Sequence, residues 1–139
     1  MHGTYGSSAP LAYGGIYELP ADVGTFDAAV FGAILMHVRD PFAALSAVAD
    51  RVLDPVVVTG SHWEPEVDPN GNVVRFAPHR IDAPNRRWMI TPGGVVRMLE
   101  RLGFSDPPIS FHAHPHHLVH DMTKPPVDIQ MYAVAAHRS

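Results

Sequence analysis

The chain has 139 residues, close to the usual size of a single domain, and two domains would each have very little core. Its hydrophobic fraction of 46%, charged fraction of 17% and formal net charge of −4 are typical of a globular protein, and argue against a disordered chain or a basic nucleic-acid-binding module. The absence of cysteine excludes disulfides, thiolate zinc sites and cysteine nucleophiles, and favours a cytoplasmic location. The apolar stretch at residues 28–38 is too short to span a bilayer, and the N-terminus lacks the pattern of a secretory signal.

The first half of the chain contains the pattern of a βαβ unit. Residues 26–32 form a nearly continuous apolar run, which predicts a strand covered on both faces within a parallel sheet. Asp40 and Pro41 supply the N-cap and first position of an amphipathic helix over residues 41–53. Residues 55–59 follow as a second buried strand. We expect the two strands to be parallel neighbours, with the helix crossing between them over one face of the sheet.

The second half begins with a long segment of little periodicity. Residues 60–90 contain several prolines and both tryptophans, and an irregular loop of this length inside a domain is more often functional than accidental. A helix is expected over residues 92–102. The alternating residues 109–112 and 129–136 predict two antiparallel strands joined by a histidine-rich turn.

Several short segments follow one another in an order that is characteristic of one enzyme family. These segments are Tyr17 to Pro20, Gly24 to Asp27, Gly32 to Pro41, Asn85 to Trp88, Thr91-Pro92 and Met98 to Phe104. They resemble the C-terminal half of a class I S-adenosylmethionine-dependent methyltransferase, in the subgroup that includes wobble-uridine tRNA-modifying and natural-product enzymes. The resemblance covers residues 13–137. It implies an α/β fold, a partial Rossmann-like methyltransferase sheet with a C-terminal antiparallel hairpin.

The N-terminal half of that family's domain has no counterpart here. Only residues 1–25 precede the first predicted strand, where the family has a strand, a glycine-rich turn, a helix and a second strand with an acidic residue for the ribose. Gly14-Gly15 is no substitute, since a nucleotide-binding turn follows a strand and opens a helix. The resemblance therefore implies a truncated transferase: residues 1–25 as a loose N-terminal arm and residues 26–139 as the C-terminal part of the domain. The resemblance implies an enzyme, but we expect such a chain on its own to bind the cofactor weakly and to have little activity.

The resemblance implies S-adenosylmethionine as the cofactor. In an open α/β sheet, ligands lie at the carboxyl ends of the strands, so residues 31–33 should line the cofactor crevice, and the resemblance adds residues 15–17 beside the adenine. The cofactor-binding candidates are thus Gly15, Ile16, Tyr17, Phe31, Gly32 and Ala33. For Gly32 two interpretations are equally favoured: a close approach of the backbone to a ligand, or relief of crowding between helix and sheet.

His37 is the candidate catalytic residue. It follows the crevice strand, and an imidazole is a common general base, so it could accept the proton of an OH or NH acceptor; otherwise it hydrogen-bonds the following loop. We expect it to face the open crevice. Asp40 is assigned to the helix cap and Arg39 to a solvated or loop-pairing charge. The substrate-binding candidates on or beside the long loop are His62, Trp63, Arg86, Arg87 and Trp88, and the alternative is that the aromatic residues anchor the loop to the core.

A histidine cluster near the C-terminus allows a metal-binding interpretation. The cluster comprises His112, His114, His116, His117 and His120. Two histidines on one face of a strand can chelate a metal ion, but a polar hairpin turn explains the composition as well, and we assign no metal site.

Three functions therefore remain open: a methyltransferase acting on a small molecule, a non-catalytic half-domain or fragment that needs a partner chain, and a histidine-rich metal-binding module. The negative net charge argues against a nucleic-acid substrate, and no membrane segment is expected. The edge of strand 26–32, which the missing half would pair, predicts self-association or recruitment of a partner strand.

Overall fold

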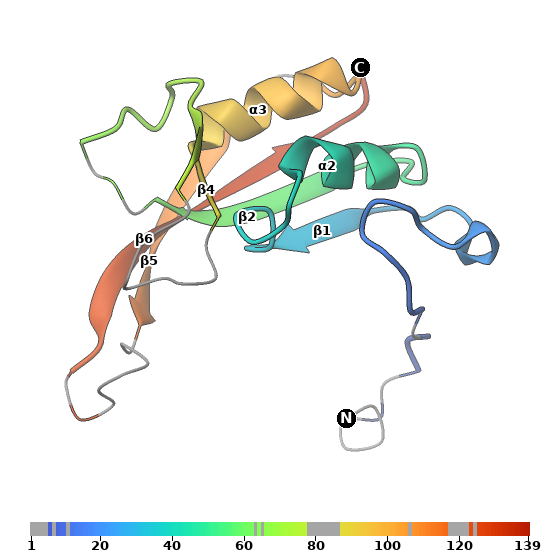
Figure 1. Ribbon diagram of the computed structural model, residues 1–139, viewed down its shortest axis with the longest axis horizontal. Coiled ribbons are helices and arrows are strands. Elements are labelled where there is room, and N and C mark those ends of the chain that lie inside the picture. The colour runs from blue at the N-terminus through green and yellow to red at the C-terminus, as the bar shows by residue number, and fades with distance from the viewer. Residues whose placement is uncertain are drawn as a thin grey trace.

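The computed structural model consists of a four-stranded sheet, a small two-stranded sheet and two helices. The described residues are 6, 8–10, 12–62, 64, 66–77, 87–105, 107–116, 123 and 125–139, with the backbone only for His62. The elements are the 3-10 turn η1 (Ala21–Val23), β1 (Ala29–Gly32), α2 (Pro41–Ala49), β2 (Val56–His62), β3 (Val74–Phe76), β4 (Trp88–Ile90), α3 (Pro92–Arg101), β5 (Ile109–His116) and β6 (Val127–Ala136). The main sheet has the order β1-β2-β6-β5, and Figure 1 shows both helices on the same face of it.

The predicted βαβ unit is confirmed. β1 and β2 pair in parallel with Ala29 opposite Val56, and α2 connects them. α2 starts as expected, because the Asp40 side chain accepts a hydrogen bond from the Ala43 amide (2.9 Å) and Pro41 occupies the first helical position. The carboxyl ends of β1 and β2 therefore lie at one edge of the sheet, and the loop to α2 leaves from that edge.

β1 is shorter than predicted. It begins at Ala29 and not at residue 26, because Phe26 pairs with the turn that follows α2. The Phe26 amide donates to the Arg51 carbonyl (2.8 Å), and the Phe26 carbonyl accepts from the Leu53 amide (2.8 Å). Residues after Ala49 are thus used for this pairing, and α2 ends there instead of continuing to residue 53.

β6 joins the two halves of the main sheet. It pairs antiparallel with β2 on one side, with Ala136 opposite Val56, and with β5 on the other, with Val134 opposite Ile109. The expected C-terminal hairpin is confirmed with longer strands, so residues 113–116 belong to β5 and not to the turn. Figure 1 shows the hairpin extending beyond the two helices.

Residues 60–90 contain regular structure, although the sequence predicted an irregular loop. β2 continues to His62, and β3 pairs antiparallel with β4. Thr91, which is fully buried, anchors this region: its hydroxyl accepts hydrogen bonds from the amides of Val73 (3.1 Å) and Gly94 (3.1 Å). One side chain therefore caps α3, as expected, and also holds the segment before β3.

The core lies between the two helices and one face of the main sheet. Its largest fully buried apolar side chains include Leu45, Leu99, Val56, Val58, Val95 and Val134. No described element packs on the opposite face of the sheet (Figure 1), and Val30 in β1 is 70% exposed. The prediction that this strand is covered on both faces is therefore wrong for the described residues, because nothing among them supplies the second covering layer.

Candidate functional site

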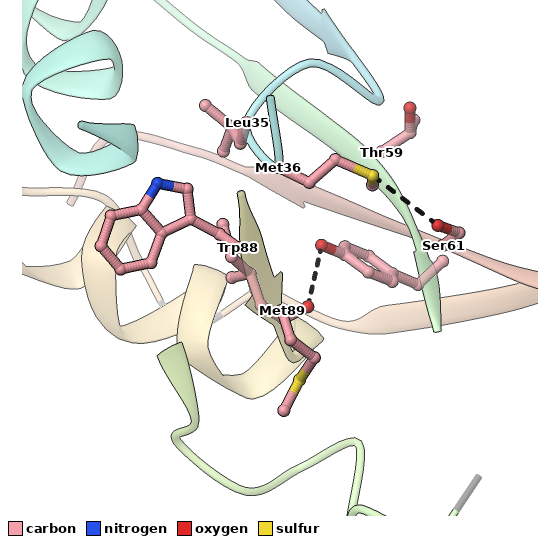
Figure 2. A pocket seen from close by; sticks show the side chains of 8 residues that line it. Leu35, Met36, Thr59, Ser61, Trp88 and Met89 are labelled. Carbon is pink, nitrogen blue, oxygen red and sulfur yellow. Dashed lines mark hydrogen bonds between the residues drawn. The ribbon is translucent and has the colours of Figure 1, made fainter. Parts of the chain in front are cut away.

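The carboxyl ends of β1 and β2 meet the β3–β4 sheet at a small cavity (Figure 2). The lining residues are Leu35, Met36, Thr59, Ser61, Trp88, Met89, Ile90 and Tyr132. They come from four separate places: the loop after β1, the end of β2, β4 and β6. The cavity has room for about one water molecule. It lies at the edge of the sheet where ligands bind in open α/β folds, so we treat it as the floor of the candidate site.

The chain leaves β1 through a strained turn at Ala33. Ala33 has φ 52°, in the left-handed region that residues with a side chain seldom adopt. Its amide points back to β2, within 3.1 Å of the Thr59 hydroxyl oxygen and 3.2 Å of the Thr59 carbonyl oxygen. Strained backbone of this kind persists where surrounding contacts enforce it, and it is concentrated at functional sites.

Gly32, which precedes this turn, and Gly15 in the N-terminal segment both have open space around them. A Cβ atom added at either glycine would meet no other atom within 4 Å. Gly32 therefore does not relieve crowding between helix and sheet, and that interpretation is wrong. Phe31 points the other way, into the core, where only 5% of it is exposed, so only its backbone faces the crevice edge.

The 33–40 loop, which runs from Ala33 to Asp40 and carries His37, is tied to β4. The Met36 carbonyl accepts hydrogen bonds from the amides of Arg87 (2.8 Å) and Trp88 (3.1 Å). The Trp88 indole Nε1–H donates to the Val38 carbonyl (3.0 Å), and the Trp88 ring makes an edge contact with Phe76 at 5.2 Å between centroids. Trp88 therefore anchors the loop, and its ring also lines the cavity (Figure 2).

The same loop is tied to the N-terminal segment through Tyr17. The hydroxyl oxygen of Tyr17 accepts hydrogen bonds from the amides of Arg39 (2.7 Å) and Asp40 (3.0 Å). The Arg39 guanidinium lies over the Tyr17 ring, 5.1 Å from its centroid, which is cation–π geometry. Ile16 and Tyr17 pack against the core, and a hydrogen bond from the Glu18 amide to the Gly15 carbonyl (3.2 Å) closes a turn there. Residues 15–18 are thus attached to the sheet.

The remaining candidates lie around this arrangement. His37 is exposed and outside the helix-packed core; its amide donates to the Ile34 carbonyl (2.9 Å), and the neighbouring Met36 lines the cavity. Arg87 is exposed next to Trp88, and His62 ends β2. Trp63 and Arg86 lie outside the described residues.

Several cavity residues were missed by the sequence analysis. Thr59 and Ser61 follow the buried valines of β2 at its carboxyl end, so strand position alone could have identified them. Ser61 Oγ lies 3.9 Å from Met36 Sδ, and the Tyr132 hydroxyl donates to the Ile90 carbonyl (3.4 Å), as Figure 2 shows. Tyr132 could not have been found, because its place depends on how β6 aligns with β2.

The histidine cluster does not form a metal centre in the described part of the chain. His112, His114 and His116 occupy alternate positions of β5 and so share one face of the strand. No group of three or more His, Asp or Glu side chains among the described residues is arranged to hold a metal ion. His117 and His120 lie outside the described residues.

The opposite, amino end of β2 carries a separate polar cluster. His137 Nδ1 lies 2.9 Å from an Asp54 carboxylate oxygen, and the Arg138 amide donates to the other oxygen (3.2 Å). The hydrogen bond from His137 lowers the pKa of the Asp54 carboxyl below its ordinary value of 3.8. The Arg138 guanidinium donates to the carbonyls of Ala49 and Val52 at the end of α2 and lies over the Phe104 ring, 4.7 Å from its centroid.

The main sheet combines a parallel β1–β2 pair with an antiparallel β6, as expected for a Rossmann-like α/β sheet with a C-terminal hairpin. The chain matches no family model and no curated protein. Among solved structures it is similar to the N-terminal domain of EvdMO1 in the presence of SAH and D-fucose, with a TM-score of 0.63 and 18% identity over 99% of this chain and 59% of that one. The same domain with SAH bound gives a TM-score of 0.57 and 18% identity, over 92% of this chain and 53% of that one. The glycopeptide N-methyltransferase MtfA complexed with S-adenosylhomocysteine gives a TM-score of 0.52 and 16% identity, over 91% of this chain and 59% of that one.

The chain therefore has the fold of class I S-adenosylmethionine-dependent methyltransferases. It spans between 53% and 59% of the length of these solved structures.

Proposed function

We propose that this chain is the carboxyl-terminal part of an S-adenosylmethionine-dependent methyltransferase that acts on a small-molecule acceptor. The observation that carries the proposal is the strained Ala33 turn at the carboxyl end of β1, beside the open space at Gly32. Two of the three similar structures, named as having SAH bound or complexed with it, support the choice of cofactor. The cofactor would supply an electrophilic methyl group for in-line attack by the acceptor.

The chain's own residues would divide into three sets. Residues 15–17 and 31–33 would lie along the cofactor, where the glycines allow a close approach to the backbone. His37 would accept the proton released by the acceptor, since an exposed imidazole can bind and release a proton near neutral pH. The acceptor-binding residues would be His62, Trp63, Arg86, Arg87 and Trp88.

A small-molecule acceptor is favoured by charge. The net charge of −4 gives no excess of cations to neutralise phosphates, which supply most non-specific affinity for nucleic acids. The name of MtfA, a glycopeptide N-methyltransferase, and the presence of D-fucose with EvdMO1 are consistent with non-nucleic-acid acceptors in this fold. We further propose a cytoplasmic location, on the absence of cysteine; among the described residues no helix is long and apolar enough to cross a membrane.

Cofactor binding can be tested with a substitution that the fold tolerates. Because a Cβ at Gly32 meets open space, Gly32→Val should fold normally and yet block the approach of a ligand. We expect S-adenosylhomocysteine to shift the amide NMR signals of residues 15–17 and 31–33 in the wild type, with affinity weaker than micromolar, and to shift none of them in Gly32→Val. Val30→Ile, which adds bulk two positions earlier on the same strand, is the matched control and should bind like the wild type. Shifts confined to other residues, or equal shifts in Gly32→Val, would contradict the proposal.

A second function is favoured by the free edge of β1. β1 is the first strand in the order of the main sheet, so one of its edges has no partner strand among the described residues. Val30 is an exposed apolar side chain within this edge strand, and Phe26, just before the strand, is also exposed. An apolar strand edge of this kind pairs readily with another chain. We therefore also propose that the chain is a half-domain that associates through β1 with a second copy or with a partner chain that supplies a strand.

Light scattering after size-exclusion chromatography tests this association. We expect the wild type to elute above monomer mass, and Val30→Lys, which places a charge on the β1 edge, to elute as a monomer. Val127→Lys changes another exposed valine, in β6, and should behave like the wild type. A monomeric wild type that no added strand-bearing polypeptide retains would exclude the half-domain function.

A further inference from the structure

The 33–40 loop contains no helix or strand, yet its backbone is held at both ends. Polar groups of the main chain require partners, and in this loop several partners come from side chains far away in sequence. The Tyr17 hydroxyl, 22 residues before Arg39, accepts hydrogen bonds from two amides of the loop. The Trp88 indole N–H, 50 residues after Val38, donates to one carbonyl of the loop.

We infer that Tyr17 and Trp88 are positioning residues, which hold the 33–40 loop and thereby His37 between the cofactor-side turn and the acceptor-side cavity. Calling these two sides a cofactor side and an acceptor side rests on the proposed function. The contacts themselves do not, and they connect residues 15–18 with β4 through a single loop. A displacement of either side would therefore move the candidate proton acceptor.

Tyr17 acts through its hydroxyl oxygen. A phenol oxygen can accept two hydrogen bonds and donate one, and here both acceptor positions are used by consecutive amides, those of Arg39 and Asp40. The Arg39 guanidinium lies over the ring of the same tyrosine. Tyr17→Phe removes the two accepted hydrogen bonds and keeps the ring for the cation–π contact, so it isolates the role of the hydroxyl.

Trp88 acts through its indole N–H, which can only donate. Its single acceptor is the Val38 carbonyl, while the ring packs against Phe76 and lines the cavity. Trp88→Phe keeps an aromatic ring at this position and removes the donor. The effect of losing the indole N–H donor can therefore be separated from the effect of removing the aromatic ring.

Amide hydrogen exchange in the full chain tests the Tyr17 part of the inference. In Tyr17→Phe we expect the amides of Arg39 and Asp40 to exchange about tenfold faster or more, the amount that corresponds to one lost hydrogen bond. The amides in the middle of α3 should exchange at the wild-type rate, which shows that the change is local. Tyr13→Phe is the matched control, because Tyr13 is 88% exposed. Unchanged exchange at Arg39 and Asp40 would overturn the inference.

The His37 imidazole signal tests positioning itself. A purely structural contact would leave the surroundings of this exposed ring unchanged, whereas a positioning contact predicts that its Cε1–H signal shifts or broadens in both Tyr17→Phe and Trp88→Phe. Imidazole signals of the histidines on β5 serve as internal references and should stay in place. If the His37 signal is unmoved in both variants, the inference is wrong. None of these measurements uses the cofactor, so a failure of S-adenosylhomocysteine to bind would remove the proposed function and leave this result standing.

Discussion

The two ends of the β1–β2 pair are built in opposite ways. At the amino end of β2, Asp54 is held by the side chain of His137 and the backbone of Arg138, and the Arg138 guanidinium closes the end of α2. At the carboxyl end, the chain turns through a strained Ala33 into a loop without regular structure. At the amino end, polar contacts connect β2, β6 and α2. At the carboxyl end, backbone strain at Ala33 and open space at Gly32 lie where ligands bind in this class of fold.

This difference indicates which residues serve the fold and which serve a function. The contacts of Arg138 connect the last strand with α2 and with Phe104, which holds the helices and the sheet together. The 33–40 loop contributes Leu35 to the core, and its hydrogen bonds with Tyr17 and Trp88 also fix the position of exposed groups such as His37. Changes at the amino end should therefore reduce stability, and changes at the carboxyl end should alter local geometry or ligand binding.

Arg138→Ala should have the largest effect on stability. It removes hydrogen bonds from a charged group to two helix-end carbonyls together with the cation–π contact on Phe104, so we expect the free energy of unfolding to fall by about 2 kcal/mol. Urea denaturation measures this change. Arg97→Ala, which removes an exposed ion pair with Glu100, should change stability by less than about 0.5 kcal/mol. If Arg138→Ala lowers the free energy of unfolding no more than Arg97→Ala does, the Arg138 contacts do not stabilise the fold as described.

Ala33→Gly should have a smaller effect of the opposite sign. Glycine adopts a positive φ without the steric cost that alanine pays, so we expect a gain of about 1 kcal/mol. Ala29→Gly, in β1 and outside the left-handed region, should instead cost roughly 0.5 to 1 kcal/mol. Thermal unfolding of the two variants side by side gives the comparison. Destabilisation by Ala33→Gly would mean that the turn stores no strain.

The smallest expected effect is the pH dependence of the Asp54 contact. The folded-state pKa of Asp54 is lowered, so its contribution to stability is present above the unfolded-state pKa near 3.8 and is lost as the pH falls through the lower folded-state value. Asp54→Asn removes this titration. The melting temperatures of wild type and Asp54→Asn should therefore differ at pH 6 and converge as the pH is lowered below about 4. A constant difference across this range would exclude the linkage.

The sequence predicts the local features of the fold well, for physical reasons. The caps at Asp40 and Thr91, the βαβ order and the alternating C-terminal strands depend on neighbouring residues and were found. The start of β1 was not predicted correctly, because it depends on the pairing of Phe26 with the turn after α2. The prediction that Val30 is buried was also wrong. An apolar pattern shows that a strand could be buried on both faces, but it does not show whether another element covers each face.

The candidate site was only partly predictable. The placement of residues 31–33 at a cofactor crevice followed from the expected strand order alone and stays a prediction. The contact of Tyr17 with Arg39 and Asp40, and the position of Tyr132 in the cavity, depend on tertiary arrangement between distant segments and have no local signature. The sequence analysis singled out Gly32 for a close approach to a ligand, whereas the left-handed conformation occurs at its neighbour Ala33.

The position of β6 between β2 and β5 has a consequence for how the chain folds. Among the described residues β5 pairs within the main sheet only with β6, although β6 follows it in sequence. During synthesis, β1, α2 and β2 can assemble early from contacts between nearby residues, whereas β5 has no edge to join until residues 127–136 are available. The histidine-bearing strand must therefore wait for β6, and closing the sheet is a late step that pairs segments as distant as Val56 and Ala136.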